Sequence, residues 1–222
     1  MKNLIYKLLF GIGYCLFAVC HIGNKRTVLM QLLLLITVSV SAQDHLIPSD
    51  YEINSDNKED ILTSSLLWGF PKKATVRYIV EPSFDANYAF VIIKDSLKYK
   101  LLCNKVTVVY DNKKKTRHLF VYPKEREISD SLYYKITRLF NLAVNQSEKT
   151  YDPNIGFDGT TYYFTIFKEK GHERTASIWN PLGKMKELTF FCDCIFNYGY
   201  ENKPNLIDSI WEQMFSMLHP DE

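Results

Sequence analysis

Short segments of strand character, placed close together along the chain, limit the folds that this sequence can adopt. The even positions from Ala74 to Val80 are all apolar, which is the two-residue period of a half-buried strand. Four further segments have strand character, at residues 88–93, 97–103, 106–110 and 117–122. Turn-forming residues separate most of them. We therefore expect five strands in an antiparallel meander.

Helical spacing replaces this alternation between residues 132 and 144. Apolar residues there recur three and four positions apart, and Ser129 stands where the N-cap of a helix belongs. Residues 160–168 and 174–179 alternate again. They predict a second hairpin.

The C-terminal part begins with an ambiguous segment at residues 185–198. Its apolar residues have helical spacing, whereas the run Thr189-Phe190-Phe191 favours a strand; we predict a helix. A clearer helix is expected at residues 204–218, with Pro204 in its first turn. The fold class is therefore α+β: an antiparallel sheet of five to seven strands with one central helix and one or two C-terminal helices.

The N-terminus has the pattern of an export signal. The first 43 residues carry four basic side chains and no acidic one. Lys25-Arg26 precedes an apolar run at residues 28–40 that ends in small residues, as in secretory signals. We predict cleavage between Ala42 and Gln43, and an exported product that is periplasmic, cell-surface or secreted.

A second apolar run, Leu4–Cys20, lies in front of this signal and leaves two alternatives open. Either residues 1–42 form one long or mis-started signal peptide, or Leu4–Cys20 is a retained membrane anchor, slightly short for a span. Membrane contact is expected only through this segment, if it stays uncleaved. Residues 43–66 are polar and acidic, which predicts a flexible leader. Residues 67–222 then form a single α+β domain.

The charge of the exported part excludes one class of partner. The signal contains four of the 27 basic residues and none of the 25 acidic ones, so the remainder is slightly acidic. A protein that binds nucleic acid needs a clustered positive surface, which this balance does not predict.

Three cysteines follow the predicted cleavage site: Cys103, Cys192 and Cys194. An odd number leaves at least one thiol unpaired within a monomer. Cys103 can bridge to either of the others, or all three can be small buried groups.

The common catalytic signatures are missing from the sequence. His172-Glu173 begins a zinc-protease motif, but Ala176 stands where the second histidine belongs. No phosphate-binding glycine loop and no Gly-x-Ser-x-Gly elbow occurs. We therefore predict no catalytic residues, no metal and no cofactor. His118, His172 and Arg174 stay as candidate surface residues.

The segment from Asp152 to Gly159 has oxygen-bearing side chains at alternate positions but does not fit a calcium loop. Phe157 stands in place of the required glycine, and Tyr163 in place of the final glutamate. We expect Asp158-Gly159 to form a tight turn, with Gly159 at positive φ.

The stretch from Asp158 to Phe164, read as Asp-Gly-Thr-Thr-Tyr-Tyr-Phe and followed by Trp179-x-Pro181, carries a family resemblance. It resembles a recurrent pattern in uncharacterised signal-bearing proteins of Bacteroides-type bacteria, and Gln43 after the cleavage site is also similar to their signals. The resemblance implies an envelope or secreted location and no activity. Asp158, Gly159, Trp179 and Pro181 are expected to have structural roles.

The strand at residues 160–168 has aromatic residues on both faces. One face must line the core, and the other forms either a second core layer or an exposed surface for a partner. Our leading hypothesis is an exported envelope or secreted protein that is not an enzyme. It would bind an envelope protein or a glycan through one sheet face or the loop at residues 145–157. The alternative is a small envelope hydrolase, which requires distant polar groups such as His118, Arg174 and Asp158 to meet in one pocket.

Overall fold

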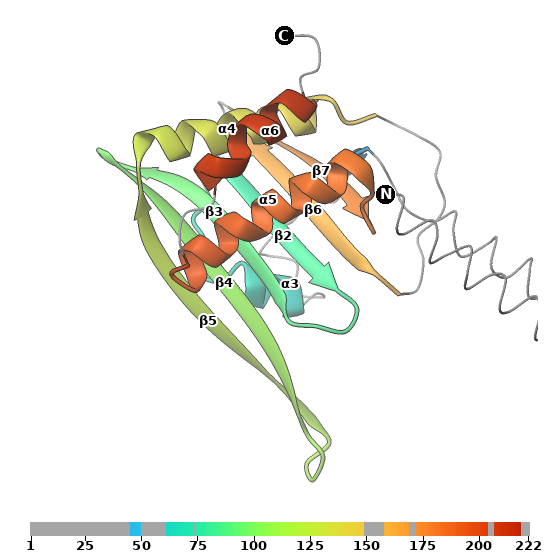
Figure 1. The fold of residues 1–222 in the computed structure, drawn as a ribbon. Coiled ribbons are helices and arrows are strands. Elements are labelled where there is room, and N and C mark those ends of the chain that lie inside the picture. The colour runs from blue at the N-terminus through green and yellow to red at the C-terminus, as the bar shows by residue number, and fades with distance from the viewer. Residues whose placement is uncertain are drawn as a thin grey trace, which may run out of the picture. The chain divides into compact units, whose positions relative to one another are not determined.

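A seven-stranded antiparallel sheet forms the centre of the protein, in the order β1-β7-β6-β2-β3-β4-β5 (Figure 1). The computed structural model describes residues 45–49, 61–72, 74–148, 158–168, 172–203 and 207–218. Within these ranges the strands are β1 (Ile47–Ser49), β2 (Val76–Pro82), β3 (Asn87–Asp95), β4 (Lys98–Asp111), β5 (Thr116–Ile128), β6 (Thr160–Phe167) and β7 (Glu173–Trp179). The helices are α3 (Ile61–Leu66), α4 (Asp130–Asn145), α5 (Gly183–Tyr200) and α6 (Ile207–Leu218). The predicted α+β class is confirmed.

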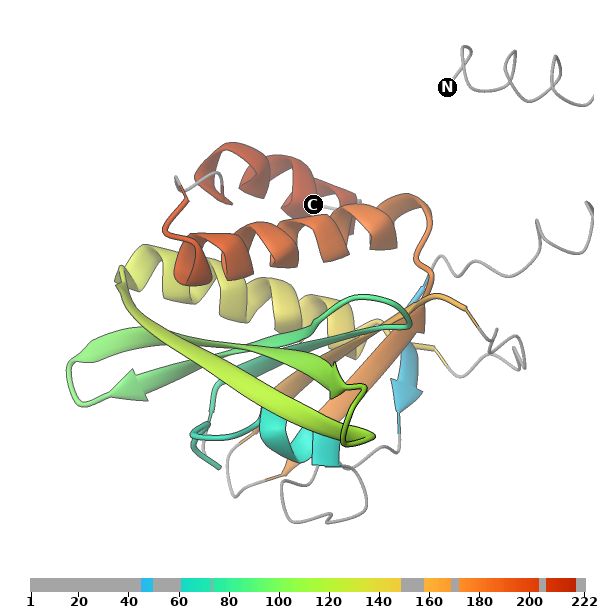
Figure 2. The same cartoon turned by 90° about the horizontal axis from the view of Figure 1, so that it is seen from below.

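Helices cover the two faces of the sheet unequally, as Figure 2 shows. We call the side that carries α4, α5 and α6 the helix face; the other side, which carries α3 alone among the helices of the described residues, is the open face. Alternation along each strand sends Tyr78, Phe90 and Phe164 to the helix face. Phe90 and Phe164 contact Phe140 of α4, and Tyr78 contacts the rings of Phe90 and Phe164. The ring centroids of Phe90 and Phe140 lie 6.0 Å apart and those of Phe140 and Phe164 5.6 Å apart. This aromatic cluster joins the sheet to its helical layer.

Both long helices have the predicted character. Ser129 caps α4, because its side chain accepts a hydrogen bond from the backbone N–H of Leu132. Residues 185–198 lie within α5, so helix was the correct choice for the ambiguous segment. The β-favouring run at Thr189 is overridden because helical spacing brings Met185, Leu188 and Cys192 onto one buried face.

Two elements lie inside the segment that the sequence predicted to be a flexible leader. β1 pairs with β7 at the edge of the sheet, and Leu46 beside it is buried. α3 packs on the open face and buries Leu66 against β2, β3 and β4. The structure thus corrects the predicted boundary at residue 67. A three-residue strand that contains Pro48 and a single short helix are too brief to show a hydrophobic period.

The strands expected at residues 97–103 and 106–110 are one continuous strand, β4. Asn104, in the gap between the two expected strands, points its side chain to the open face and donates hydrogen bonds to the carbonyls of Leu66 and Trp68, each at 2.8 Å. A buried polar side chain with both donors satisfied does not interrupt a strand. Two expected strands merge into β4, and β1 adds one strand that was not expected. The sheet therefore still has seven strands.

The second aromatic face of β6 was predicted to be either a second core layer or an exposed surface for a partner, and the structure distinguishes the two. Phe164 and Ile166 line the helix face, whereas Tyr163 packs into a smaller cluster beneath α3. Thr165, on the same side as Tyr163, is fully buried and shares a hydrogen bond with Thr175 of β7. The second face of β6 is therefore a second core layer, as in the first of the two alternatives.

The neighbouring phenylalanines of α5 provide a test of how this helix is oriented. Phe191 is fully buried beside Trp211 of α6, whereas Phe190 is 54% exposed. We expect Phe191→Ala to lower the free energy of unfolding by about 3–5 kcal/mol, because it leaves a cavity. The matched change Phe190→Ala should lower it by less than about 1 kcal/mol. Urea denaturation measures both, and equal losses would contradict the orientation of α5.

Candidate functional site

The hairpin of β4 and β5 extends beyond the rest of the sheet. β3 pairs with β4 only from Asp95↔Lys98 to Asn87↔Val106, so beyond Val106 the partner of β4 is β5 alone. We call residues 107–120 the arm. Figure 1 shows it projecting away from the helical layer. An isolated two-stranded ribbon is only marginally stable in water.

Large apolar side chains of the arm are exposed on both of its faces. Val109 and Phe120 extend the helix face, whereas Val108 and Tyr110 extend the open face, and each is between 46% and 51% exposed. Tyr122, at the base of the arm, is 48% exposed. Residues of this type favour extended backbone, which explains why the ribbon forms. Their exposure is typical of a surface that contacts another molecule.

The tip of the arm is strongly positive. The Asp111 carboxylate accepts hydrogen bonds from the backbone N–H groups of Lys113 and Lys114, which closes the turn. Lys115 completes it at φ 53°. With Arg117 on the adjoining strand, four cations surround the single carboxylate of Asp111. The arm therefore combines apolar faces with a positive end.

β5 is an edge strand with two different halves. In its C-terminal half, Lys98 pairs with Glu127 at 2.7 Å and Lys100 with Glu125 at 3.0 Å, while Pro123 removes one backbone donor. Proline and charged side chains are the usual protection of an edge against further pairing. The N-terminal half, Thr116–Tyr122, contains no proline and no carboxylate. Its edge can accept another strand.

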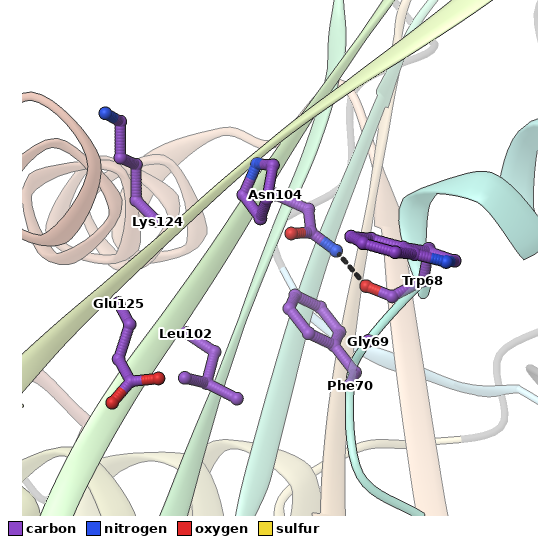
Figure 3. A pocket seen from close by; sticks show the side chains of 8 residues that line it. Trp68, Gly69, Phe70, Leu102, Asn104, Lys124 and Glu125 are labelled. Atoms are coloured by element: carbon purple, nitrogen blue, oxygen red, sulfur yellow. Dashed lines mark hydrogen bonds between the residues drawn. The ribbon is translucent and has the colours of Figure 1, made fainter.

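A shallow pocket of about 300 Å³ lies on the open face near the base of the hairpin. Trp68 and Phe70 from the loop after α3 face Leu102 and Asn104 of β4, as Figure 3 shows. Trp68 is 63% exposed, and Gly69 beside it has φ 75°, which glycine adopts without strain. Trp68 and Phe70 give the pocket an aromatic wall, and Lys124 and Glu125 of β5 also line it, so it suits binding through apolar and charged contacts.

The residues that the hydrolase alternative requires do not meet. His118 is exposed on the arm, where its Nε2 lies 3.1 Å from Thr116 Oγ1. Arg174 lies on β7, with four strands between it and β5 in the sheet order, and donates hydrogen bonds to Asn145 and Ser147. Asp158 is exposed at the start of β6, and His172 is exposed before β7. These positions do not form one pocket.

The residues of the family-like pattern do come together, around the start of β6 and the end of β7. Gly159 exchanges hydrogen bonds with Ser83: its N–H donates to Ser83 Oγ, and its carbonyl accepts from Ser83 N and Oγ. Asn180 pairs with Thr160 through N–H···O at 3.1 Å and Oδ1···H–N at 3.0 Å. Pro181 follows and lines a pocket beside α5. These contacts join the start of β6 to the end of β7, and the structural roles expected for the pattern stay a prediction.

The expected positive φ at Gly159 is wrong. Gly69 and Gly183 are the glycines with positive φ among the described residues, and Gly159 is not one of them. A Cβ at Gly159 would lie 2.5 Å from Trp179 Nε1 and 2.6 Å from the side-chain Oδ1 and Nδ2 of Asn180. Glycine is needed there because other side chains approach closely, not because the backbone is left-handed.

One polar cluster was not predicted from the sequence. Asp193 of α5 accepts hydrogen bonds at Oδ1 from Tyr88 at 2.7 Å and Tyr78 at 3.1 Å. Burial raises the pKa of Asp193, and the hydrogen bonds from Tyr88 and Tyr78 partly oppose that change. Burial and the Asp193 charge together raise the pKa of both tyrosines, so they stay protonated donors. The partners are separated by 105 and 115 residues, so no local motif marks them.

The remaining candidate chemistry is limited in the part of the chain that the structure describes. Cys103, Cys192 and Cys194 are free thiols, the first two buried, and burial raises the pKa of each. No group of three His, Cys, Asp or Glu side chains in the described ranges is placed to hold a metal ion. No helix in those ranges has the length and apolar character needed to span a bilayer. The predicted cleavage site at Ala42 and Gln43 and most of the loop at residues 145–157 lie outside them.

Comparison of the chain with protein-family models, with curated proteins and with solved structures found no match.

The close approach at Gly159 can be measured with a mutant cycle. Gly159→Ala should lower the free energy of unfolding by about 1–3 kcal/mol, as overpacking usually does. In an Asn180→Gly background, which removes two of the three closest atoms, the same change should cost at least about 0.5 kcal/mol less. Gly183→Ala is the control, because φ 53° strains it although no atom lies within 4 Å. Identical costs of Gly159→Ala in both backgrounds would refute this explanation.

Proposed function

We propose that this chain is an exported, non-catalytic interaction domain that binds a protein partner of the cell envelope through the arm. The observation that carries the proposal is the exposure of Val108, Val109, Tyr110 and Phe120 on a two-stranded ribbon that nothing in the described chain covers. The Lys25-Arg26 signal pattern and the resemblance to signal-bearing envelope proteins support export.

Binding of a partner would lower the free energy of the arm, because it would bury apolar side chains that are exposed. Four large apolar side chains are each about half exposed, and further burial of apolar surface is worth about 25 cal/mol per Å². A partner that covers the ribbon also supplies the third layer of contacts that a two-stranded structure lacks. Aromatic residues such as Tyr110 and Phe120 are common energetic centres of protein interfaces.

The edge and the charge of the arm point to an extended acidic segment as the bound part of the partner. The Thr116–Tyr122 edge has no proline, so an added strand can form main-chain hydrogen bonds with it. Lys113, Lys114, Lys115 and Arg117 present four cations, which favour carboxylates on the incoming strand. The slightly acidic remainder of the exported chain would repel such a segment elsewhere.

The hydrolase alternative gains no support from the geometry. Its candidate residues His118 and Arg174 lie on strands separated by four others in the sheet order, and Asp158 is exposed at the start of β6.

Site-directed photo-crosslinking in the producing cells tests the arm. A benzophenone amino acid at Tyr110 or Phe120 should give the same single protein adduct, and at the more exposed Tyr134 on α4 it should give none. Purified with this chain, the captured protein should bind at least about 30-fold more weakly to Phe120→Glu, the loss of one interface centre. Because Phe120 is half exposed, the melting temperature should hardly change. Adducts with a second copy of this chain, or equal adducts at Tyr134, would overturn the proposal.

A triple variant tests the charge of the tip. Lys113→Gln, Lys114→Gln and Lys115→Gln together should weaken binding of the captured protein and flatten its dependence on salt, because screened attraction is lost. The control is a pair at Lys184 and Lys186 on α5, changed to Gln in the same way. An unchanged salt dependence in the tip variant would remove the acidic segment from the proposal.

Export has a separate test. Mass spectrometry of the native product should find Gln43 as the first residue, since Ala42 supplies the small side chain that signal peptidase requires. Peptides from residues 1–30 in the exported protein would refute cleavage at this site.

A further inference from the structure

A pocket of about 400 Å³ lies between α5 and the loop that joins β7 to α5. Asn180, Pro181 and Leu182 form its loop side, and Tyr162 of β6 contributes a ring. Its volume is within the range of small-ligand sites. No residue of the arm lines it, so an inference about this pocket is independent of the proposed partner.

The α5 wall of the pocket is one stripe of the helix. Lys186, Phe190 and Asp193 line it, spaced by four and three residues. Residues with this spacing lie on one face of a helix, and seven residues rise about 10.5 Å. The two charged groups therefore mark opposite ends of the pocket, with the exposed ring of Phe190 between them.

The Asp193 end of the pocket is negative, and the carboxylate there is held in a position that favours a bound cation. Oδ1 is held by the hydroxyl groups of Tyr78 and Tyr88, which are neutral donors. No lysine, arginine or histidine of the described chain forms an ion pair with Asp193, and its second oxygen has no hydrogen-bond partner there. A half-buried carboxylate of this kind gains from a bound ammonium group.

The opposite end is positive. Lys186 carries the one cationic side chain among the residues that line the pocket. Leu182, the N-cap of α5, provides no side-chain cap, and the N–H groups of Met185 and Lys186 donate to its carbonyl, which leaves the N–H groups of Gly183 and Lys184 available at the start of the helix. The helix dipole adds to the attraction of a carboxylate at this end.

We propose that this pocket binds a linear zwitterion whose ammonium group meets Asp193 and whose carboxylate meets Lys186 at the start of α5. The ligand class is a short peptide or an ω-amino acid. Two to three extended residues span about 7–10 Å, which matches the two-turn separation of the charges. The apolar centre of such a ligand lies against Phe190 and Leu182.

Three six-carbon probes test the two ends separately: 6-aminohexanoate carries both charges, hexylammonium the positive one and hexanoate the negative one. Isothermal titration calorimetry on the domain should give 6-aminohexanoate at least about ten-fold higher affinity than either single-charge probe. That factor corresponds to about 1.4 kcal/mol, a modest value for one charge-assisted contact.

Two variants assign the ends. Asp193→Asn should reduce the affinity for 6-aminohexanoate to that for hexanoate, and Lys186→Gln should reduce it to that for hexylammonium. Lys186 is exposed, so its variant keeps the fold even if Asp193→Asn weakens the packing of α5. The Lys184→Gln control, on the same helix but outside the pocket, should bind as the unaltered protein does.

The proposal fails if 6-aminohexanoate shows no binding at millimolar concentration, or if all three probes bind equally. It also fails if Lys186→Gln leaves the preference for 6-aminohexanoate intact. If Asp193→Asn lowers the melting temperature but the affinity for 6-aminohexanoate does not fall, Asp193 serves only to hold α5, and the ligand assignment is wrong.

Discussion

The unequal length of neighbouring strands determines much of this structure. β4 and β5 have 14 and 13 residues, whereas β3 has nine and pairs no further than Val106. Where a strand extends past the end of its neighbour, no adjacent strand continues the sheet on that side. The helices of the helix face then have no sheet surface to pack on. The arm follows from this mismatch, as do its exposed apolar faces. The sequence places β-branched and aromatic residues there without providing a core for them.

The position of α5 depends on contacts with two central strands. Tyr78 of β2 and Tyr88 of β3 both donate hydrogen bonds to the Asp193 carboxylate, so one half-buried side chain ties the helix to two strands at once. Further along, Gly199 allows close approach to β4, because a Cβ there would lie 2.6 Å from Leu101 Cδ2 and 2.7 Å from Cys103 Sγ. The polar contact and the close packing together fix the rotation of α5, and the rotation decides which residues face the pocket.

Local patterns predicted the fold better than the site. Strand alternation and the Ser129 cap identified β2, β3, β5 and α4 because their signals lie within a few residues. β1 was not predicted because three residues cannot show a period, and no local pattern marks the contacts of Asn104, whose partners Leu66 and Trp68 lie 38 and 36 residues away. Gly159 was correctly singled out for the wrong reason, since Trp179 and Asn180 are brought beside it only by the hairpin. The Asp193 cluster joins residues more than 100 positions apart, which no single-sequence pattern reveals.

The two edges of the sheet in the described chain are unlike, and this limits how copies of the protein can associate. At one edge β1 offers three residues, one of them Pro48, whereas at the other β5 offers seven unprotected residues. Endless growth of a sheet from molecule to molecule requires every copy to present two receptive edges. A copy with a single long edge can join at most one neighbour, through a two-fold pairing of like strands that consumes both. Edge-to-edge contact between these strands therefore ends at a pair, so the protein can carry one long receptive strand without polymerising into fibres.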